Sequence, residues 1–186
     1  FYVVADRTRK TFTKEEKDKR YHQVLLAKNA TGYKNLVKLT SLGFIEGMYS
    51  KYPRIDKQLL EQYKEGLIAT TCCLGAMVPQ LILQGKEEEA EKEFKWWLDL
   101  FGDDYYVEFQ RHGMAEQDKV NSVLVRFATK HNVKMIASND SPGGTSGRVR
   151  PCHESLSPNC DGIAVTQRHF FSAVSSIDTT TSALNG

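Results

Sequence analysis

The chain contains a short apolar segment that leads into a carboxylate, Lys134-Met135-Ile136-Ala137-Ser138-Asn139-Asp140. Such a segment is typical of a buried strand. Before it, helix-like and strand-like segments alternate with turn residues between them, whereas residues 141–186 are rich in Ser, Thr, Gly and Pro and lack periodicity. We therefore expect a folded part that ends near Ser141 and a tail that is disordered or non-native. A shifted reading frame or a chimeric join would explain such a tail.

The residues before this segment predict an α/β protein. Runs of β-branched and aromatic residues predict strands, and apolar residues repeated every three or four positions predict helices. We expect strands near 1–4, 22–27, 52–55, 67–71, 105–109 and 134–139, and helices near 30–46, 56–63, 76–84, 86–101 and 115–132. Helices between strands indicate βαβ units and a largely parallel sheet or barrel. The first two strands are close in sequence, so they are expected to pair antiparallel.

Two of the predicted helices carry clear apolar stripes that should face a core. The stripes are formed by Ala90, Phe94, Trp97, Leu98 and Phe101 in one helix, and by Val120, Val123, Leu124, Phe127 and Ala128 in the other. In the helix near 30–46, Tyr33, Leu36, Val37 and Phe44 lie near one face, and Gly47 marks its end.

Composition sets wide limits on function. A net charge of +2 gives no argument for nucleic-acid binding. Basic residues are frequent between Asp6 and Arg20, but acids alternate with them, which favours a solvated loop over a phosphate-binding patch. Four cysteines without a regular framework favour a reducing, cytoplasmic setting, and no apolar run is long enough to span a bilayer. The chain opens within a strand, which we interpret as the start of a fragment.

Several residues that can bind metals lie at the ends of predicted strands. In parallel α/β folds, reacting groups lie beyond the carboxyl ends of the strands, where Cys73, His112 and Asp140 are expected. His22 begins its strand, yet it reaches the same edge because that strand runs antiparallel to its neighbour. Imidazole, thiol and carboxylate together form a plausible shell for a divalent metal.

Each of these residues also has a structural interpretation. His22 alone would more often be a hydrogen-bonded strand end, and Cys73 alone a small core residue. Asp140 would cap the next turn, and His112 would close one. Cys72 and Cys73 are adjacent and should point in different directions, so at most one is expected to enter a site. His131 suits the end of a helix, and Cys152, His153 and Cys160 match no strong zinc pattern.

The chain is also similar to a known family. The resemblance rests on motifs in a fixed order, namely residues 22–29 and 32–36, the turn Pro53-Arg54-Ile55-Asp56, Gly66-Leu67-Ile68-Ala69 leading to Cys73-Leu74-Gly75 and Pro79, Gln110-Arg111-His112-Gly113 with Glu116-Gln117, and Ser138-Asn139-Asp140. Together they resemble the polymerase-and-histidinol-phosphatase (PHP) domain at the N-terminus of bacterial replicative DNA polymerase III alpha subunits. The resemblance covers residues 1–141. No single motif is decisive, but the order and spacing are specific.

The resemblance implies a partial version of a distorted (β/α)7 barrel over residues 1–141, followed by a non-family tail at 142–186. In metal-binding members, nine side chains hold up to three divalent ions, and His22, Cys73 and Asp140 fall on ligand positions. His112 is at most a neighbour, and Pro142 stands where the last histidine belongs. Zinc, manganese or magnesium is therefore expected in the complete protein. This chain is expected to hold none tightly, because its shell is incomplete.

The resemblance also implies a function. The chain would be a fragment of a cytoplasmic replicative polymerase, whose complete form synthesises DNA as a nucleotidyltransferase and has DNA and replisome subunits as partners. The fragment alone is expected to be inactive. Its PHP part would be a metal-dependent 3′-5′ exonuclease or phosphoesterase, or a structural support. The alternatives are a free-standing PHP phosphoesterase for a small phosphate ester, against which the polymerase-like segment from Tyr33 to Asp56 argues, and an inert interaction domain.

Overall fold

The computed structural model describes residues 1–13, 16–111 and 113–138. The predicted tail at 142–186, with Cys152, His153 and Cys160, lies outside the described residues. The elements follow in the order β1 (Tyr2–Val4), β2 (Tyr21–His22), β3 (Leu25–Ala27), α1 (Ala30–Ile45), β4 (Arg54–Asp56), α2 (Lys57–Tyr63), β5 (Leu67–Thr70), α3 (Met77–Leu83), α4 (Glu87–Phe101), the 3-10 helix η1 (Gly102–Asp104), β6 (Tyr105–Phe109), α5 (Ala115–His131) and β7 (Met135–Ala137).

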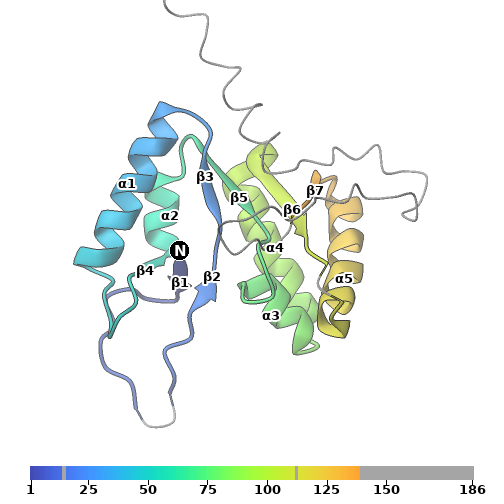
Figure 1. Ribbon diagram of the computed structural model, residues 1–186, viewed down its shortest axis with the longest axis horizontal. Helices are drawn as coiled ribbons and strands as arrows, with labels where there is room; N and C mark the ends of the chain where they lie inside the picture. Colours follow the sequence, from blue (N-terminus) through green and yellow to red (C-terminus); the bar gives the residue numbers. More distant parts are fainter. Residues whose placement is uncertain (14–15, 112, 139–186) are drawn as a thin grey trace, which may run out of the picture.

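The described strands form two sheets, one with the order β2-β1-β4 and one with the order β3-β5-β6-β7. The pairs β1–β4, β5–β6 and β6–β7 are parallel, whereas β1–β2 and β3–β5 are antiparallel. The predicted antiparallel pairing of the first two strands is thus confirmed. Within the described ranges neither sheet closes on itself (Figure 1). The fold is a mixed α/β arrangement with open sheets, and the barrel that the resemblance implies stays a prediction.

The strand predicted at 22–27 is divided in two at Gln23. The backbone of Gln23 still pairs with the first sheet, because its N–H donates to the Phe1 carbonyl at 3.0 Å and its carbonyl accepts from the Phe1 amine at 2.9 Å. Its buried side chain turns the other way, and Nε2 donates to the Thr70 carbonyl at 2.8 Å. A single residue therefore links the two sheets, with its backbone bonded to Phe1, directly before β1, and its side-chain amide bonded to Thr70 of β5.

Helix α1 packs on β3 and β4 through a different face from the one its aromatic residues occupy. Asn29 caps the helix as predicted, because its side chain accepts from the N–H of Gly32. Leu39 and Gly43 are buried, whereas Tyr33, Val37 and Phe44 are exposed, Tyr33 to 65%. Because glycine has no side chain, α1 can lie close to β4 at Gly43 and close to Gly66, directly before β5, at Gly32. Tyr33, Val37 and Phe44 thus lie on the outer face of α1, whereas Leu36, predicted on the same face, is partly buried and packs against the core.

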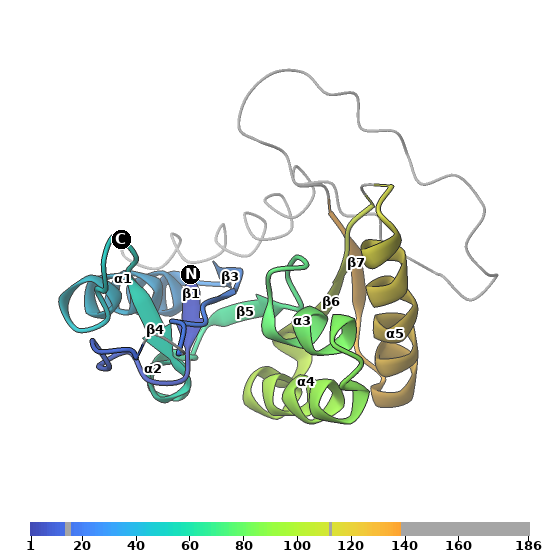
Figure 2. The same cartoon turned by 90° about the horizontal axis from the view of Figure 1, so that it is seen from below.

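The stripes of α4 and α5 face the core as predicted. Ala90, Phe94, Trp97 and Phe101 of α4 are buried, and so are all five predicted residues of α5, while Leu98 is partly buried. Phe94 lies at the centre, with ring centroids of Tyr105 and Phe127 within 5.5 Å. Figure 2 shows α3, α4 and α5 beside β6 and β7, with α1 and α2 beside β4. None of the helices in the described ranges has the length and hydropathy of a membrane span.

Strand β7 differs from the buried strand that the sequence predicts. Met135, Ile136 and Ala137 are only partly buried. Among the described strands, β7 pairs with β6 alone and forms the edge of its sheet. An edge strand has a neighbour on one side and keeps part of its surface accessible. Its apolar composition therefore reflects its pairing with β6 and the packing of Met135 against the core rather than complete burial.

In its described residues the predicted charged loop is mostly exposed, but the side chains of Arg7 and Asp18 are largely buried. The side chain of Asp18 is 8% exposed, and its Oδ1 accepts from Nη1 of Arg54 at 2.8 Å. Arg54, on β4, is fully buried. Its other guanidinium nitrogens donate to the carbonyl oxygens of Gly47, Arg7 and Arg9 at 2.8 to 3.0 Å. One guanidinium thus joins the loop to the end of α1 and to the first sheet.

Candidate metal-binding site

His22 and Cys73 meet where the two sheets adjoin. Nδ1 of His22, at the end of β2, lies 3.5 Å from Sγ of Cys73, in the loop after β5. The backbone N–H of His22 donates to the Gly75 carbonyl at 2.9 Å, which holds the two segments together. Gly75 has to be small here, because a Cβ would lie 2.8 Å from Nδ1 of His22. The antiparallel turn thus brings His22 to the carboxyl end of β5, as the sequence predicts.

The backbone at Cys72 sets the direction of Cys73. Cys72 has a φ of 58°, in the left-handed region that is rare for a residue with a side chain. Its N–H donates to Oγ1 of Thr70 at 3.1 Å, which closes a tight turn after β5. The prediction that the two cysteines point apart is wrong, because the turn brings their sulfur atoms to 3.9 Å. Cys72 is nevertheless buried, and only Cys73 faces His22.

The two thiols differ in acidity. The pKa of Cys73 is lowered to about 5, first by the hydrogen bond from the Cys72 thiol and then by the backbone at Gly75 and by His22. The pKa of Cys72 is raised, because its proton is shared with Cys73 and because the side chain is buried. Near neutral pH, Cys73 is therefore the thiolate of the pair and Cys72 the neutral donor.

This difference predicts selective alkylation. We expect iodoacetamide to modify Cys73 at a rate that rises through a midpoint near the lowered pKa of about 5 and then levels off, because the thiolate is lost as the pH falls through that value. Cys72 should stay unmodified in the folded chain. Peptide-resolved mass spectrometry over a pH series would measure both rates, and His22→Ala should move the midpoint upward. A Cys73 midpoint near the ordinary value of 9.0 would contradict the geometry.

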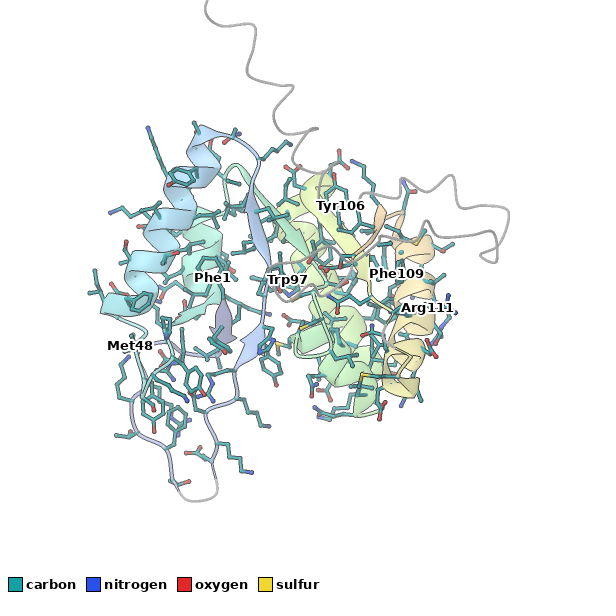
Figure 3. The ribbon with its side chains drawn as sticks, in the orientation of Figure 1. Phe1, Met48, Trp97, Tyr106, Phe109 and Arg111 are labelled. Carbon is teal, nitrogen blue, oxygen red and sulfur yellow. The ribbon has the colours of Figure 1, made fainter. Side chains whose placement is uncertain are left out.

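A cavity of about 620 Å³ lies beside this pair. His22, Cys73 and Gln110 contribute polar atoms to its wall, and Phe1 and Phe44 contribute apolar surface. Phe1, labelled in Figure 3, marks the side of the cavity that belongs to the first sheet. The candidate donors are therefore accessible from a hollow rather than enclosed in the core.

A buried acid that the sequence analysis missed lies deeper in the second sheet. Glu108 is 8% exposed, and Phe109, labelled in Figure 3, follows it at the end of β6. Oε2 of Glu108 accepts from the Thr70 hydroxyl at 2.6 Å. Oε1 of Glu108 accepts from the Ser138 hydroxyl and, at 3.2 Å, from Nε2 of Gln110. The signal that could have revealed it is a carboxylate between two apolar residues of a predicted strand.

The His22–Cys73 pair fits a metal by chemistry and by spacing. Imidazole nitrogen and thiolate sulfur are ordinary zinc ligands, and on one tetrahedral ion at usual bond lengths they lie about 3.5 Å apart, as they do here. Within the described ranges, no group of three or more His, Cys, Asp or Glu side chains could hold an ion. Asp140 and His112, the other predicted site residues, lie outside the described residues. The described part of the site thus supplies two matched donors.

His131 has a role away from this site. Its Nε2 lies 2.7 Å from Oε1 of Glu91, and its ring is near that of Phe94. This position at the end of α5 agrees with the structural role predicted from the sequence.

Comparison with known proteins shows to which family the chain belongs. The PHP domain family matches residues 3–112, a range that includes both His22 and Cys73. The chain belongs to the PHP domain family. Residues 113–138 of the described fold extend beyond this match and carry α5 and β7.

Within the PHP family, the chain is similar to DNA polymerase III alpha subunits. It is 51% identical to that of Borreliella burgdorferi over 121 residues, which are 65% of this chain and 10% of the relative. It is 49% identical to that of Thermus aquaticus over 120 residues, 64% of this chain and 10% of the relative. With the Aquifex aeolicus subunit, the identity is 44% over 72% of this chain and 12% of the relative. The chain spans about a tenth of the length of these curated relatives.

Proposed function

We propose that this chain is the PHP part of a bacterial replicative DNA polymerase, the alpha subunit of DNA polymerase III. The complete protein would synthesise DNA and contact DNA and other replisome subunits. The observation that carries the proposal is an identity of 44 to 51% to several such subunits over 64 to 72% of this chain. The chain alone would not synthesise DNA.

Within this protein, we propose that His22 and Cys73 help to hold a divalent metal for phosphodiester hydrolysis in the PHP cavity. A bound divalent ion would supply a water of lowered pKa as the nucleophile. Cys73 contributes a thiolate near neutral pH, and His22 contributes a ring nitrogen that lies 3.5 Å from the Cys73 sulfur. Asp140 would be a further ligand, as the family resemblance implies. The cavity beside the pair gives a phosphate ester room to approach.

A chimeric polymerase tests the first proposal. The aligned segment of the Thermus aquaticus subunit would be replaced by the matching residues of this chain, and DNA synthesis on a primed template would be measured. We expect the chimera to keep its synthesis rate within about threefold, since at 49% identity the core and the surfaces toward the rest of the protein are compatible. A folded chimera that makes no DNA would contradict the proposal.

The same chimera separates hydrolysis from structural support. If the cavity hydrolyses DNA, His22→Ala and Cys73→Ala should abolish metal-dependent release of 3′ nucleotides while synthesis continues. If the cavity only supports the polymerase, wild type and variants should release 3′ nucleotides equally slowly. In that case the substitutions should lower the melting temperature and the rate of synthesis together. Tyr33→Ala, on the exposed face of α1, serves as a control with no expected effect on release.

A further inference from the structure

Glu108, on β6, bonds to residues close in sequence to Cys73 and to Asp140. Its carboxylate receives the hydroxyl of Thr70, the last residue of β5, and the hydroxyl of Ser138, the residue after β7. Thr70 lies three positions before Cys73, and Ser138 lies two before Asp140. One buried carboxylate on β6 thus bonds to both neighbouring strand ends, each of which leads into a predicted ligand.

The link from Glu108 to Cys73 runs through Thr70. Oγ1 of Thr70 donates its proton to Glu108 and accepts from the N–H of Cys72 at 3.1 Å. That bond closes the turn in which Cys72 takes its left-handed conformation, and the turn aims Cys73 at His22. Without an acceptor for its proton, the Thr70 hydroxyl would be free to rotate and the turn would lose a fixed partner.

The backbone around Glu108 supports the same turn. Its N–H donates to Oγ1 of Thr71 at 2.8 Å, and the same hydroxyl lies 3.4 Å from the Glu108 carbonyl. Side chain and backbone of one residue therefore contact both threonines that precede the cysteines. Because a buried carboxylate is stable only when its oxygens are satisfied, this set of donors fixes its position in turn.

We infer that Glu108 is a positioning residue, which joins the ends of β5 and β7 and thereby keeps Cys73 within reach of His22. The inference deepens the proposed function, because it concerns the same cavity and rests on its metal-binding role. Residues behind metal ligands commonly act in this way, and their loss weakens metal binding by about 10- to 100-fold.

The test compares four variants of the intact chain, with Cd²⁺ as a probe for a thiolate and imidazole pair. Glu108→Ala removes the acceptor, and Thr70→Val removes the relaying hydroxyl while it keeps the shape. Thr70→Ser retains the hydroxyl. Glu93→Ala is the matched control, because Glu93 is also 8% exposed and hydrogen-bonded, but on α4. Cd²⁺ affinity by calorimetry and amide exchange at Cys72 are measured for each.

We expect Glu108→Ala and Thr70→Val to weaken Cd²⁺ binding by at least about tenfold and to speed exchange of the Cys72 amide by a similar factor. Thr70→Ser should stay within about threefold of wild type in both measurements. Glu93→Ala should lower stability and leave both readouts unchanged at conditions where it is folded. Rescue by serine distinguishes positioning from a general loss of packing.

Two results would overturn the inference. One is a folded Thr70→Val variant with wild-type Cd²⁺ affinity and wild-type exchange at Cys72. The other is a Thr70→Ser variant as weak as Thr70→Val. If the wild-type chain takes up no Cd²⁺, as its incomplete shell allows, amide exchange at Cys72 alone decides whether Glu108 positions the turn. If Glu108→Ala does not fold, the comparison of Thr70→Val with Thr70→Ser still tests the inference.

Discussion

Arg54→Ala is expected to lower the free energy of unfolding by about 3–5 kcal/mol, the range for removing one partner from a buried ion pair. The substitution leaves the carboxylate of Asp18 in a site where it is 8% exposed. It also removes the donors to the carbonyl oxygens of Gly47, Arg7 and Arg9. Urea unfolding followed by circular dichroism would measure the loss.

Arg20→Ala is the control for this prediction. Arg20 also donates to Asp18, at 2.8 Å, but its side chain is 27% exposed and Arg54 remains to pair with the acid. We expect a cost of about 1 kcal/mol or less, including the loss of its contact with the Tyr52 ring. If the two substitutions lowered the free energy of unfolding equally, the burial of Arg54 would not contribute to its effect on stability. Arg54→Lys should also be destabilising, because an ammonium group cannot reproduce the hydrogen bonds that the planar guanidinium donates in several directions.

Gly32→Ala is expected to destabilise the chain by about 3 kcal/mol or more, at the upper end of the range for overpacking. A Cβ on Gly32 would lie 1.8 Å from the carbonyl oxygen of Gly66. That oxygen is part of the backbone and accepts from the N–H of Lys28 at 2.8 Å, so it cannot rotate away as a side chain would. Movement there would pull β5 from β3, which pair at Ala27 and Leu67.

Gly43→Ala, in the same helix, is expected to have the opposite sign or no effect. Its added Cβ would meet Cγ2 of Ile55 at 3.4 Å, an ordinary contact. Alanine is favoured over glycine inside a helix by up to about 1 kcal/mol. Thermal and urea unfolding of both variants would reveal the difference. Similar losses at positions 32 and 43 would mean that the close approach of α1 to Gly66 is not what limits residue size.

Local and periodic signals predicted much of the fold. Asp56 begins α2 because its carboxylate accepts from the N–H of Leu59, a bond formed three residues along the same chain. The stripe of α4 is visible because helical spacing puts Ala90, Phe94 and Trp97 on one side whatever they pack against. Likewise, the pairing of β1 with β2 follows from their closeness in sequence.

The remaining features depend on contacts that no local pattern encodes. The division at Gln23 follows from bonds to Phe1 and to Thr70, which is 47 residues away. The role of Glu108 appears only when β5 and β7 lie on either side of β6. The left-handed turn at Cys72 breaks the strand alternation on which the prediction of divergent thiols relied. Proximity of His22 to Cys73 was predictable, since strand direction alone was enough.

The double attachment of Gln23 bears on how the chain folds. The paired residues of β1 and β2 are at most 20 positions apart and can meet early, whereas β3 has to wait for β5, whose partner residues lie some 40 positions later. The strands on either side of Gln23, β2 and β3, thus find their partners at different times. If they separated afterwards, each would lose a bond at the same position, so neither half can unravel without loosening the other. The chain should therefore behave as one cooperative unit rather than as two lobes joined by a hinge.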